Sequence, residues 1–304
     1  MSDQEPKYDK TFGKDENYKA CFVFDWDDSL FPSSFFSKNV QSIGQKYKSF
    51  ETYSEGVKAA FWALGLTVRC VLENAKSLGD VIIVTSAQAG WVELCVKTHF
   101  IDPDFQEFFK TIKVVSARTQ FETSGKIPVQ SDPLCPWLSL SVQYKMFAFH
   151  ELFMSDLQQP RKVQEVISIG DSMAERFALW LVCKGQNIRR EGWTEGLFPK
   201  TIKMIDRPSI EQLIEQLKIL NSLLKDFICH VGDLNLDITE KDLQITKNVL
   251  KSTPAIVAGQ PVALASAEHV DAVLALTVHV SAARPAVHSL NDLVDAVLAS
   301  VANE

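Results

Sequence analysis

The feature that most constrains the fold is residues 21–29, CFVFDWDDS. Four consecutive apolar residues are followed at once by three carboxylates, Asp25, Asp27 and Asp28. A short continuous apolar run is typical of a strand that is buried on both faces of a parallel sheet. Open α/β sheets bind ligands at the carboxyl ends of their strands, so this segment predicts an α/β fold with a site there. The alternative is a solvated acidic turn.

Two further apolar runs, residues 81–84 and 166–169, also end in small polar or acidic residues: Thr85 and Ser86 after the first, and Gly170, Asp171 and Glu175 after the second. The carboxyl ends of parallel strands lie along the same edge of a sheet. The sequence therefore predicts a doubly wound, mostly parallel sheet at whose edge these hydroxyls and carboxylates meet. Carboxylates crowded in this way repel one another unless a cation or a phosphoryl group organises them.

A lysine on the helix before the third of these strands is a candidate for a fixed positive charge. The apolar spacing predicts a helix that begins just before Lys145 and carries one stripe: Val142, Met146, Phe149 and Phe153. Lys126, in a polar loop, is the competing candidate. An ordinary surface position for Lys145 is also open.

The order and spacing of these motifs resemble the haloacid dehalogenase-like (HAD) superfamily over residues 19–205. The first motif of that family is a strand followed by Asp-x-Asp-x-Thr/Ser, which here runs from Asp25 to Ser29. The second is a Thr or Ser at a strand end, and the third is a Lys. The fourth is Gly-Asp-x-x-x-Asp/Glu, which here runs from Gly170 to Glu175. The resemblance implies an HAD-like Rossmannoid core.

The resemblance also implies a Mg²⁺-dependent phosphatase or phosphotransferase that works through an aspartyl-phosphate. Asp25 would attack phosphorus, and Asp27 would protonate the leaving oxygen and later accept a proton from water. Asp25, Asp171 and the backbone carbonyl of Asp27 would bind Mg²⁺, and Glu175 would orient a metal-bound water.

Three further polar side chains have implied roles. Either Thr85 or Ser86 would donate a hydrogen bond to the phosphoryl group, and Lys145 would offset negative charge there. Asp28 is interpreted either as a surface acid or as an acid that lies behind the side chains that contact the substrate.

Two other classes of protein were compared with this pattern. A receiver domain needs a phosphoacceptor Asp at the end of a strand between the first two features, and residues 30–79 contain no apolar strand that ends in Asp. The remaining alternative is a non-catalytic HAD-like subunit that acts as an interaction or structural component. Loss of a motif residue would favour that alternative, but no motif residue is missing.

The spacing between motifs bears on the substrate. Neither the segment 30–84 nor the segment 87–144 has room for a large inserted cap domain once its expected helices are counted. In the family that the chain resembles, such open sites go with macromolecular substrates, of which a phosphorylated protein is one, or with a partner that closes the site.

Composition limits the partners and the compartment. The 304 residues are 46% hydrophobic and 23% charged, which is ordinary for a globular chain, and the net charge of −7 disfavours nucleic acid and anionic membranes as partners. The six cysteines are scattered without a Cys-x-x-Cys pair, as expected for reduced thiols in a cytoplasmic or nuclear protein. Residues 1–18 are expected to be a flexible polar lead-in without a signal peptide, and no segment has the apolar length of a membrane span.

The other predicted elements follow apolar spacing. They are a helix over 57–75 that ends near Gly79, a helix over 89–99 whose core face is Trp91, Leu94, Cys95 and Thr98, a strand at 114–115, a long loop over 118–137, a helix over 176–182 and a strand over 201–205. His99 is interpreted as a helix-end residue and not as a ligand.

The C-terminal third is predicted to extend beyond the core. Residues 206–252 form a helical extension with a short heptad seam over 210–227, which favours docking within the chain and leaves a protein partner open. Residues 253–304 form an Ala/Val-rich appended module that contains the repeats 270–275 and 294–299. Its three histidines, His269, His279 and His288, lack the spacing of a metal site.

Overall fold

The computed structural model describes residues 19–41, 51, 53–129, 139–155, 163–189, 198–230 and 232–244. The chain divides into two compact units between Asp237 and Ile238, and all the strands and helices below belong to the first. The predicted lead-in at 1–18 and the predicted module at 253–304, with its repeats and histidines, lie outside the described residues.

The core is a six-stranded sheet in which every pairing is parallel. Its strands are β1 (Lys19–Phe24), β2 (Gly79–Thr85), β3 (Lys113–Ser116), β4 (Val163–Gly170), β5 (Phe198–Lys203) and β6 (Leu234–Asp237). The order β3-β2-β1-β4-β5-β6 is that of doubly wound α/β folds, so the predicted α/β class with a parallel sheet is confirmed. The order reverses between β1 and β4, where such sheets bind their ligands. The sequence did not predict β6.

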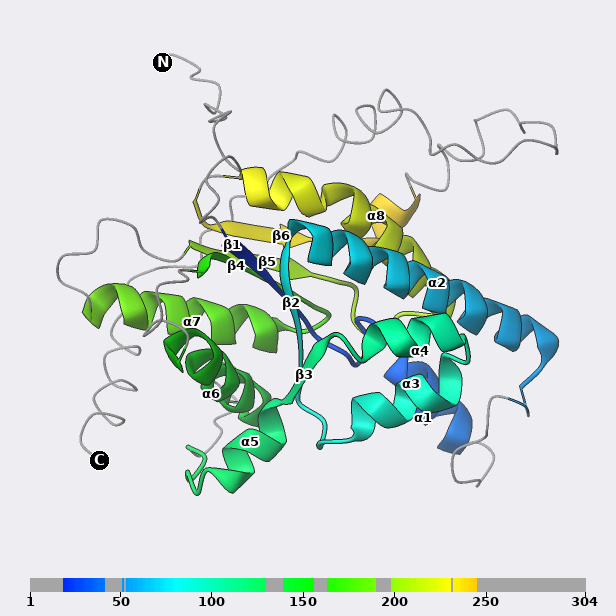
Figure 1. The fold of residues 1–304 in the computed structure, drawn as a ribbon, viewed down its shortest axis with the longest axis horizontal. Helices are drawn as coiled ribbons and strands as arrows, with labels where there is room; N and C mark the ends of the chain where they lie inside the picture. Colours follow the sequence, from blue (N-terminus) through cyan, green and yellow to red (C-terminus); the bar gives the residue numbers. More distant parts are fainter. Residues whose placement is uncertain are drawn as a thin grey trace, which may run out of the picture. The chain divides into compact units, whose positions relative to one another are not determined.

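Helices cover both faces of this sheet (Figure 1). They are α1 (Ser33–Gln41), α2 (Glu55–Leu78), α3 (Trp91–His99), α4 (Pro103–Phe109), α5 (Ala117–Thr123), α6 (Leu140–Ser155), α7 (Met173–Arg189) and α8 (Ile210–Cys229). In Figure 1, α2 and α8 lie over one face, and α6 and α7 lie over the other. The predicted loop over 118–137 is wrong at its N-terminal end, because α5 extends to Thr123. The Ser116 side chain caps the start of this helix.

Apolar stripes explain where the helices pack. The stripe of α2 is buried, as predicted, and α8 packs against α2 through a stripe that includes Leu213, Leu217, Leu220 and Leu224. The heptad spacing of α8 therefore reflects docking within the chain. On the opposite face, Cys21 and Val23 of β1 join a cluster with α6 and α7 that includes Phe149, Leu152 and Leu179.

The predicted core face of α3 is wrong by about one position. Its buried residues are Val92, Cys95, Val96 and His99. Leu94, which was predicted to face the core, is 50% exposed. This rotation places Trp91 at the edge of the core, where it is only half-buried.

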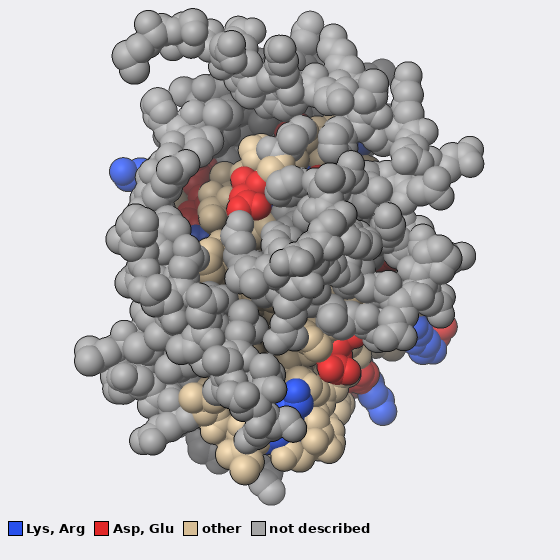
Figure 2. Space-filling model, turned by 90° about the vertical axis from the view of Figure 1, so that its left-hand side faces the viewer, with Lys and Arg blue, Asp and Glu red and all other residues tan. Residues whose placement is uncertain are grey.

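None of the described helices is both long enough and apolar enough to cross a membrane. On the face in Figure 2, the visible described acidic and basic side chains lie apart in small groups of both signs.

A buried lysine, Lys200, ties β5 to β4 and to the end of α8. Lys200 is fully buried, and its ammonium group donates to the Glu165 carboxylate and to the carbonyl oxygens of Phe227 (2.7 Å) and His230 (2.6 Å). Burial lowers the pKa of Lys200, and the hydrogen bond that Lys200 donates to Glu165 opposes this change. The unpaired carbonyls at a helix C-terminus favour a cation in this position.

We expect Lys200→Met to lower the free energy of unfolding by about 3 to 5 kcal/mol, because it removes the buried ammonium group that pairs with the Glu165 carboxylate. Urea denaturation of the parent and the variant measures the difference. Lys110→Met is the control: Lys110 is 69% exposed in its pair with Glu107, so this change should cost less than about 0.5 kcal/mol. Equal losses in the two variants would contradict a structural role for the buried pair.

Candidate active site

A buried lysine lies between two buried carboxylates at the carboxyl edge of the sheet. The Lys145 ammonium on α6 donates to Asp25 Oδ1 at 2.7 Å and to Glu175 Oε1. Lys145 is 2% exposed, so water contributes little to the solvation of its charge. Burial opposes that charge, but attraction to Asp25 and Glu175 is stronger and raises the pKa of Lys145.

Backbone contacts fix the loops that carry these side chains. Asp25 directly follows β1, and its N–H donates to the Ile169 carbonyl of β4 at 2.8 Å. The Asp171 N–H, after β4, donates to the Ser29 hydroxyl oxygen at 3.0 Å. The ends of β1 and β4 are therefore joined at two points, and the first and fourth predicted motifs meet.

Glu175 is held in the first turn of α7. Its Oε2 accepts from the Ser172 N–H at 3.2 Å and from the Ser172 hydroxyl at 2.6 Å. The side chain also packs on Gly170, where a Cβ would lie 2.5 Å from Glu175 Cγ. Any larger residue at position 170 would displace Glu175, which explains sterically why the predicted motif has a glycine there.

Burial and mutual repulsion raise the pKa values of two of these acids. The pKa of Asp25 is about 7, because burial raises it and Glu175 and Asp27 add to the effect, while Lys145 opposes it. The pKa of Asp171 is about 8, raised first by burial and then by the charges of Asp25 and Glu175. Burial and the crowding of the carboxylates therefore disfavour the ionised forms of Asp25 and Asp171, even with Lys145 nearby.

Asp27 is held by donors from three different segments. Its Oδ1 accepts from the Ser33 hydroxyl and from the Trp91 indole N–H (2.9 Å), and its Oδ2 accepts from the Thr85 hydroxyl at 3.0 Å. Thr85 is buried at the end of β2, and its oxygen also accepts from the Ala87 N–H at 2.9 Å.

The structure distinguishes the members of the two pairs of alternative motif residues by their contacts. Of the candidate hydroxyls, Thr85 contacts Asp27, whereas the Ser86 hydroxyl pairs with that of Ser141 at 3.0 Å. Of the candidate lysines, Lys145 lies among the carboxylates, whereas the exposed Lys126 lies 5.0 Å from the centre of the Phe147 ring.

Asp28 is not a surface acid. It is 7% exposed, and its carboxylate accepts from the N–H of Ser34 (2.8 Å) and from the Ser34 hydroxyl (2.5 Å). Burial raises its pKa, and the two bonds from Ser34 oppose that shift. Its backbone is in the left-handed region, with φ of 56°, as the tight turn after β1 requires.

Sequence reasoning missed Ser33, Trp91 and Ser172. Ser33 begins α1, Trp91 begins α3 after the left-handed Gly90, and Ser172 precedes α7. Each of these residues lies at or just before the first residue of a helix, where side chains can reach the edge of the sheet. A hydroxyl or indole N–H at such a position was the signal that could have identified them.

The donor set fits a hard divalent cation. Asp25 and Asp171 supply carboxylate oxygens at the joined ends of β1 and β4. Within the described residues, no three His, Cys, Asp or Glu side chains form a preformed metal group. Mg²⁺ does not need one, because it commonly binds one or two carboxylates together with water and substrate phosphate.

An aromatic cluster packs behind the acidic turn. The Phe31 ring stacks on Trp26 at 5.8 Å and on Phe36 at 5.1 Å, and the His99 ring lies 4.6 Å from Phe36. His99 is 4% exposed, and its Nδ1 has no hydrogen-bond partner in the described part of the chain. Burial lowers the pKa of His99 to about 4.

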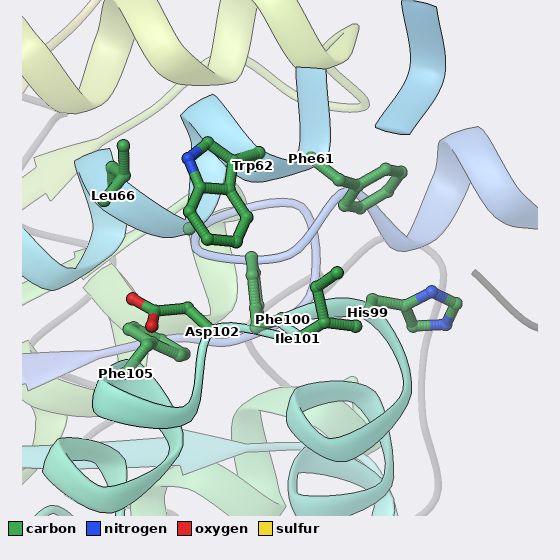
Figure 3. A pocket seen from close by; sticks show the side chains of 9 residues that line it. Phe61, Trp62, Leu66, His99, Phe100, Ile101, Asp102 and Phe105 are labelled. Carbon is green, nitrogen blue, oxygen red and sulfur yellow. The ribbon is translucent and has the colours of Figure 1, made fainter. Parts of the chain in front are cut away.

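An apolar pocket lies outside the acidic cluster. Figure 3 shows Phe61 and Trp62 of α2 above Phe100 and Ile101, which follow α3. None of the predicted site residues is among the residues that line it. We therefore do not assign this pocket to the candidate active site.

Comparison of the chain with protein-family models, with curated proteins and with solved structures gave no match. The functional argument therefore depends on the residues and their geometry.

His99→Phe should make the stability less sensitive to acid. The folded-state pKa of about 4 lies below the ordinary value of 6.5, so stability is full above pH 6.5 and is lost as the pH falls toward 4. From about pH 7.5 to about pH 5, the variant should lose about 1 kcal/mol less unfolding free energy than the parent. Chemical denaturation at the two pH values measures this.

Tyr53→Phe is the matched control for the cluster. The Tyr53 ring lies 6.1 Å from His99, and burial raises its pKa to about 12, far from the pH range tested. This variant should keep the pH dependence of the parent. A His99→Phe variant with the same pH dependence as the parent would show that His99 is not the titrating group.

Proposed function

We propose that this chain is a Mg²⁺-dependent, HAD-like phosphatase or phosphotransferase that acts through an aspartyl-phosphate on Asp25. One observation carries the proposal: Lys145, Asp25, Glu175 and Asp171 meet at the carboxyl ends of β1 and β4, where the strand order reverses. Doubly wound sheets bind ligands at that point.

Asp25 is suited to act as the nucleophile. Its Oδ1 is held by Lys145, and the backbone bond to Ile169 fixes the residue at the strand end. A held carboxylate can approach phosphorus in line without loss of further side-chain freedom. The Lys145 charge also offsets negative charge that a phosphate brings into the site.

Asp27 is suited to act as the acid and base, and Thr85 to bind the phosphoryl group. In the first step Asp25 bonds to phosphorus, the bond to the leaving oxygen breaks, and that oxygen takes a proton from Asp27. In the second step water attacks phosphorus, gives its proton to Asp27 and releases inorganic phosphate from Asp25. The Thr85 hydroxyl is adjacent to Asp27 and can turn toward a phosphoryl oxygen.

Asp25, Asp171 and the backbone carbonyl of Asp27 are the groups that would hold Mg²⁺. When bound, Mg²⁺ would neutralise charge on the phosphoryl oxygens. Glu175 is already engaged by Lys145 and Ser172, so its role would be to orient water at the metal.

A macromolecular substrate such as a phosphorylated protein is the substrate class we favour. The described residues between β1 and β2 fold into α1 and α2, and those between β2 and β4 fold into β3 and the helices α3 to α6. In the described ranges these segments are therefore part of the doubly wound core and add no separate cap over the acidic edge.

Asp25→Asn and Asp27→Asn test the two carboxylate roles. With dinitrophenyl phosphate and Mg²⁺, Asp25→Asn should reduce phosphate release to background, because an amide cannot form the acyl-phosphate. Asp27→Asn should slow turnover by about 10² to 10⁴, since it lacks the base for hydrolysis. Its phosphoenzyme should accumulate, which acid-quenched radiolabelling or intact-protein mass spectrometry can detect.

Asp80→Asn is the matched control, because Asp80 is exposed near the start of β2, at the opposite edge of the sheet. It should retain the rate of the parent. If the parent, Asp25→Asn and Asp27→Asn all release phosphate equally, the acidic cluster is not catalytic, and the interaction-subunit alternative replaces the enzyme.

Asp171→Asn should weaken Mg²⁺ binding at least about tenfold, because a neutral amide is a poorer ligand for a hard cation. Isothermal titration with Mg²⁺ in the absence of substrate measures this without relying on activity. The metal-free variant should be at least as stable as the parent near pH 8, because burial makes ionised Asp171 unfavourable. Unchanged Mg²⁺ affinity would remove Asp171 from the metal site.

A further inference from the structure

We propose that the apolar pocket beside α2 is a docking site for an amphipathic helix of a partner protein, one that carries a Lys or Arg next to its apolar face. The pocket lies between α2 and the connection from α3 to α4, and none of the predicted site residues lines it. The proposal concerns binding alone and does not rest on the proposed phosphatase activity.

The pocket has a buried floor and an exposed apolar rim (Figure 3). The rings of Phe100 and Phe105 on the floor are almost fully buried. The rim includes three large side chains that are about half exposed: Trp62 (48%), Leu66 (49%) and Ile101 (45%). Single exposed apolar side chains are normal on a protein surface, but a group of them around one recess is typical of an interaction site.

A glycine allows the floor to form. Phe100 packs against α2 at Gly65, where a Cβ would lie 3.0 Å from Phe100 Cδ1. A larger residue at position 65 would therefore have to displace the ring that forms the floor. The recess depends on the absence of a side chain at this one position of α2.

The outer face of α2 carries an apolar stripe of its own. Its exposed residues include Ala59, Trp62, Ala63 and Leu66, which have the spacing i, i+3, i+4 and i+7. This stripe is separate from the buried stripe of α2, which faces the core. The outer face of a surface helix is normally polar, and this apolar spacing is the one through which helices pack on each other. A further helix is therefore the occupant that fits this face.

One end of the pocket is acidic. Figure 3 shows Asp102 at the end of the pocket opposite His99, and the Asp102 side chain is 23% exposed. Its Oδ1 caps α4 by accepting from the Asp104 N–H at 3.1 Å. Its Oδ2 accepts no hydrogen bond from the residues that the structure describes, and the Arg69 Nη1 lies 3.8 Å from it. This oxygen can therefore accept from a partner.

Arg69 does not neutralise this end of the pocket. Its Nε donates to Glu73 Oε1 at 2.8 Å, and the charges of Asp102 and Asp104 also act on it. One cation thus faces three carboxylates, so this end carries net negative charge. A Lys or Arg on the docked helix complements that charge, whereas an acidic helix or an anionic membrane surface does not.

A displayed library of helical peptides, selected on the full chain, tests the proposal. We expect the enriched peptides to share apolar side chains at i, i+3 or i+4 and i+7, with a Lys or Arg beside them. Fluorescence anisotropy of one labelled, enriched peptide then gives its Kd for the parent and for each variant. This readout does not depend on any enzymatic activity.

Leu66→Asp should raise this Kd at least about tenfold, because it places a charge on the apolar rim. Trp62→Ala, which adds no charge, should also raise it at least about tenfold. Leu94→Asp is the matched control for Leu66→Asp. Leu94 is equally exposed, at 50%, but it lies on α3 outside the pocket, so this variant should keep the Kd of the parent.

Asp102→Asn tests the charge at the end of the pocket. Asn is as good a helix cap as Asp, so this change keeps the cap of α4 and removes only the negative charge. The Kd of the enriched peptide should rise about threefold. A peptide whose Lys or Arg is replaced by Gln should bind the parent and Asp102→Asn equally, which makes the pair a double-mutant cycle.

Three results of the peptide experiment would overturn the proposal. They are a selection without a shared apolar and basic pattern, an enriched peptide that binds Leu66→Asp as tightly as the parent, and a peptide lacking its basic residue that is still weakened by Asp102→Asn.

Two further measurements would assign the face to a different occupant and so contradict the proposal. A dimer in sedimentation velocity that Leu66→Asp abolishes and Leu94→Asp keeps would assign the face to a second copy of this chain. Photo-crosslinking from benzoylphenylalanine at position 66 that joins only residues of the same molecule, with the enriched peptide present, would assign it to a segment of the chain itself.

Discussion

The buried ammonium of Lys145 is the interaction on which the rest of the acidic edge depends. It is 2% exposed and contacts carboxylates from two other segments, Asp25 after β1 and Glu175 in the first turn of α7. Burial and repulsion favour protonation of Asp25, and the Lys145 charge opposes this effect. Lys145 therefore joins α6, β1 and α7 and supplies the positive charge of the acidic edge.

The sheet supplies the framework for this contact. All of its pairings are parallel, so the ends of β1, β2 and β4 lie along one edge. The bonds from Asp25 to Ile169 and from Asp171 to Ser29 then join the two strands at which the order reverses. Helices cover both faces of the sheet, and a site that must position a nucleophile requires such a packed framework.

The same arrangement explains why the site favours a phosphate and a cation together. The pKa values of Asp25 and Asp171 are raised first by burial and then by repulsion between the carboxylates, which one lysine offsets only in part. A divalent cation would relieve it, and a phosphoryl group would then bring further charge to the cation and to Lys145. Proteins accept such unfavourable clusters where they have a function.

The sequence by itself determined the fold class and the positions of the acids. Apolar runs of strand length before Asp25, Thr85 and Asp171 predict parallel strands whose polar ends meet, because side-chain burial and strand direction are local properties of the pattern. The stripes of α2 and α8 were likewise visible as spacings of three and four. The sequence missed β6, a four-residue strand whose burial pattern is only intermediate and exposed, so it carries no apolar signal.

The tertiary structure decided which of several chemically equal side chains lie in the site. Lys145 and Lys126 have the same side chain, but only the docking of α6 places Lys145 between Asp25 and Glu175. Neighbouring residues at a strand end point in different directions, which gives Thr85 the contact with Asp27 and turns Ser86 toward Ser141. The bond from Trp91 to Asp27 spans 64 residues and depends on the rotation of α3, which apolar spacing placed one position away. Local patterns determine elements, but the rotation of each packed element determines which side chains meet.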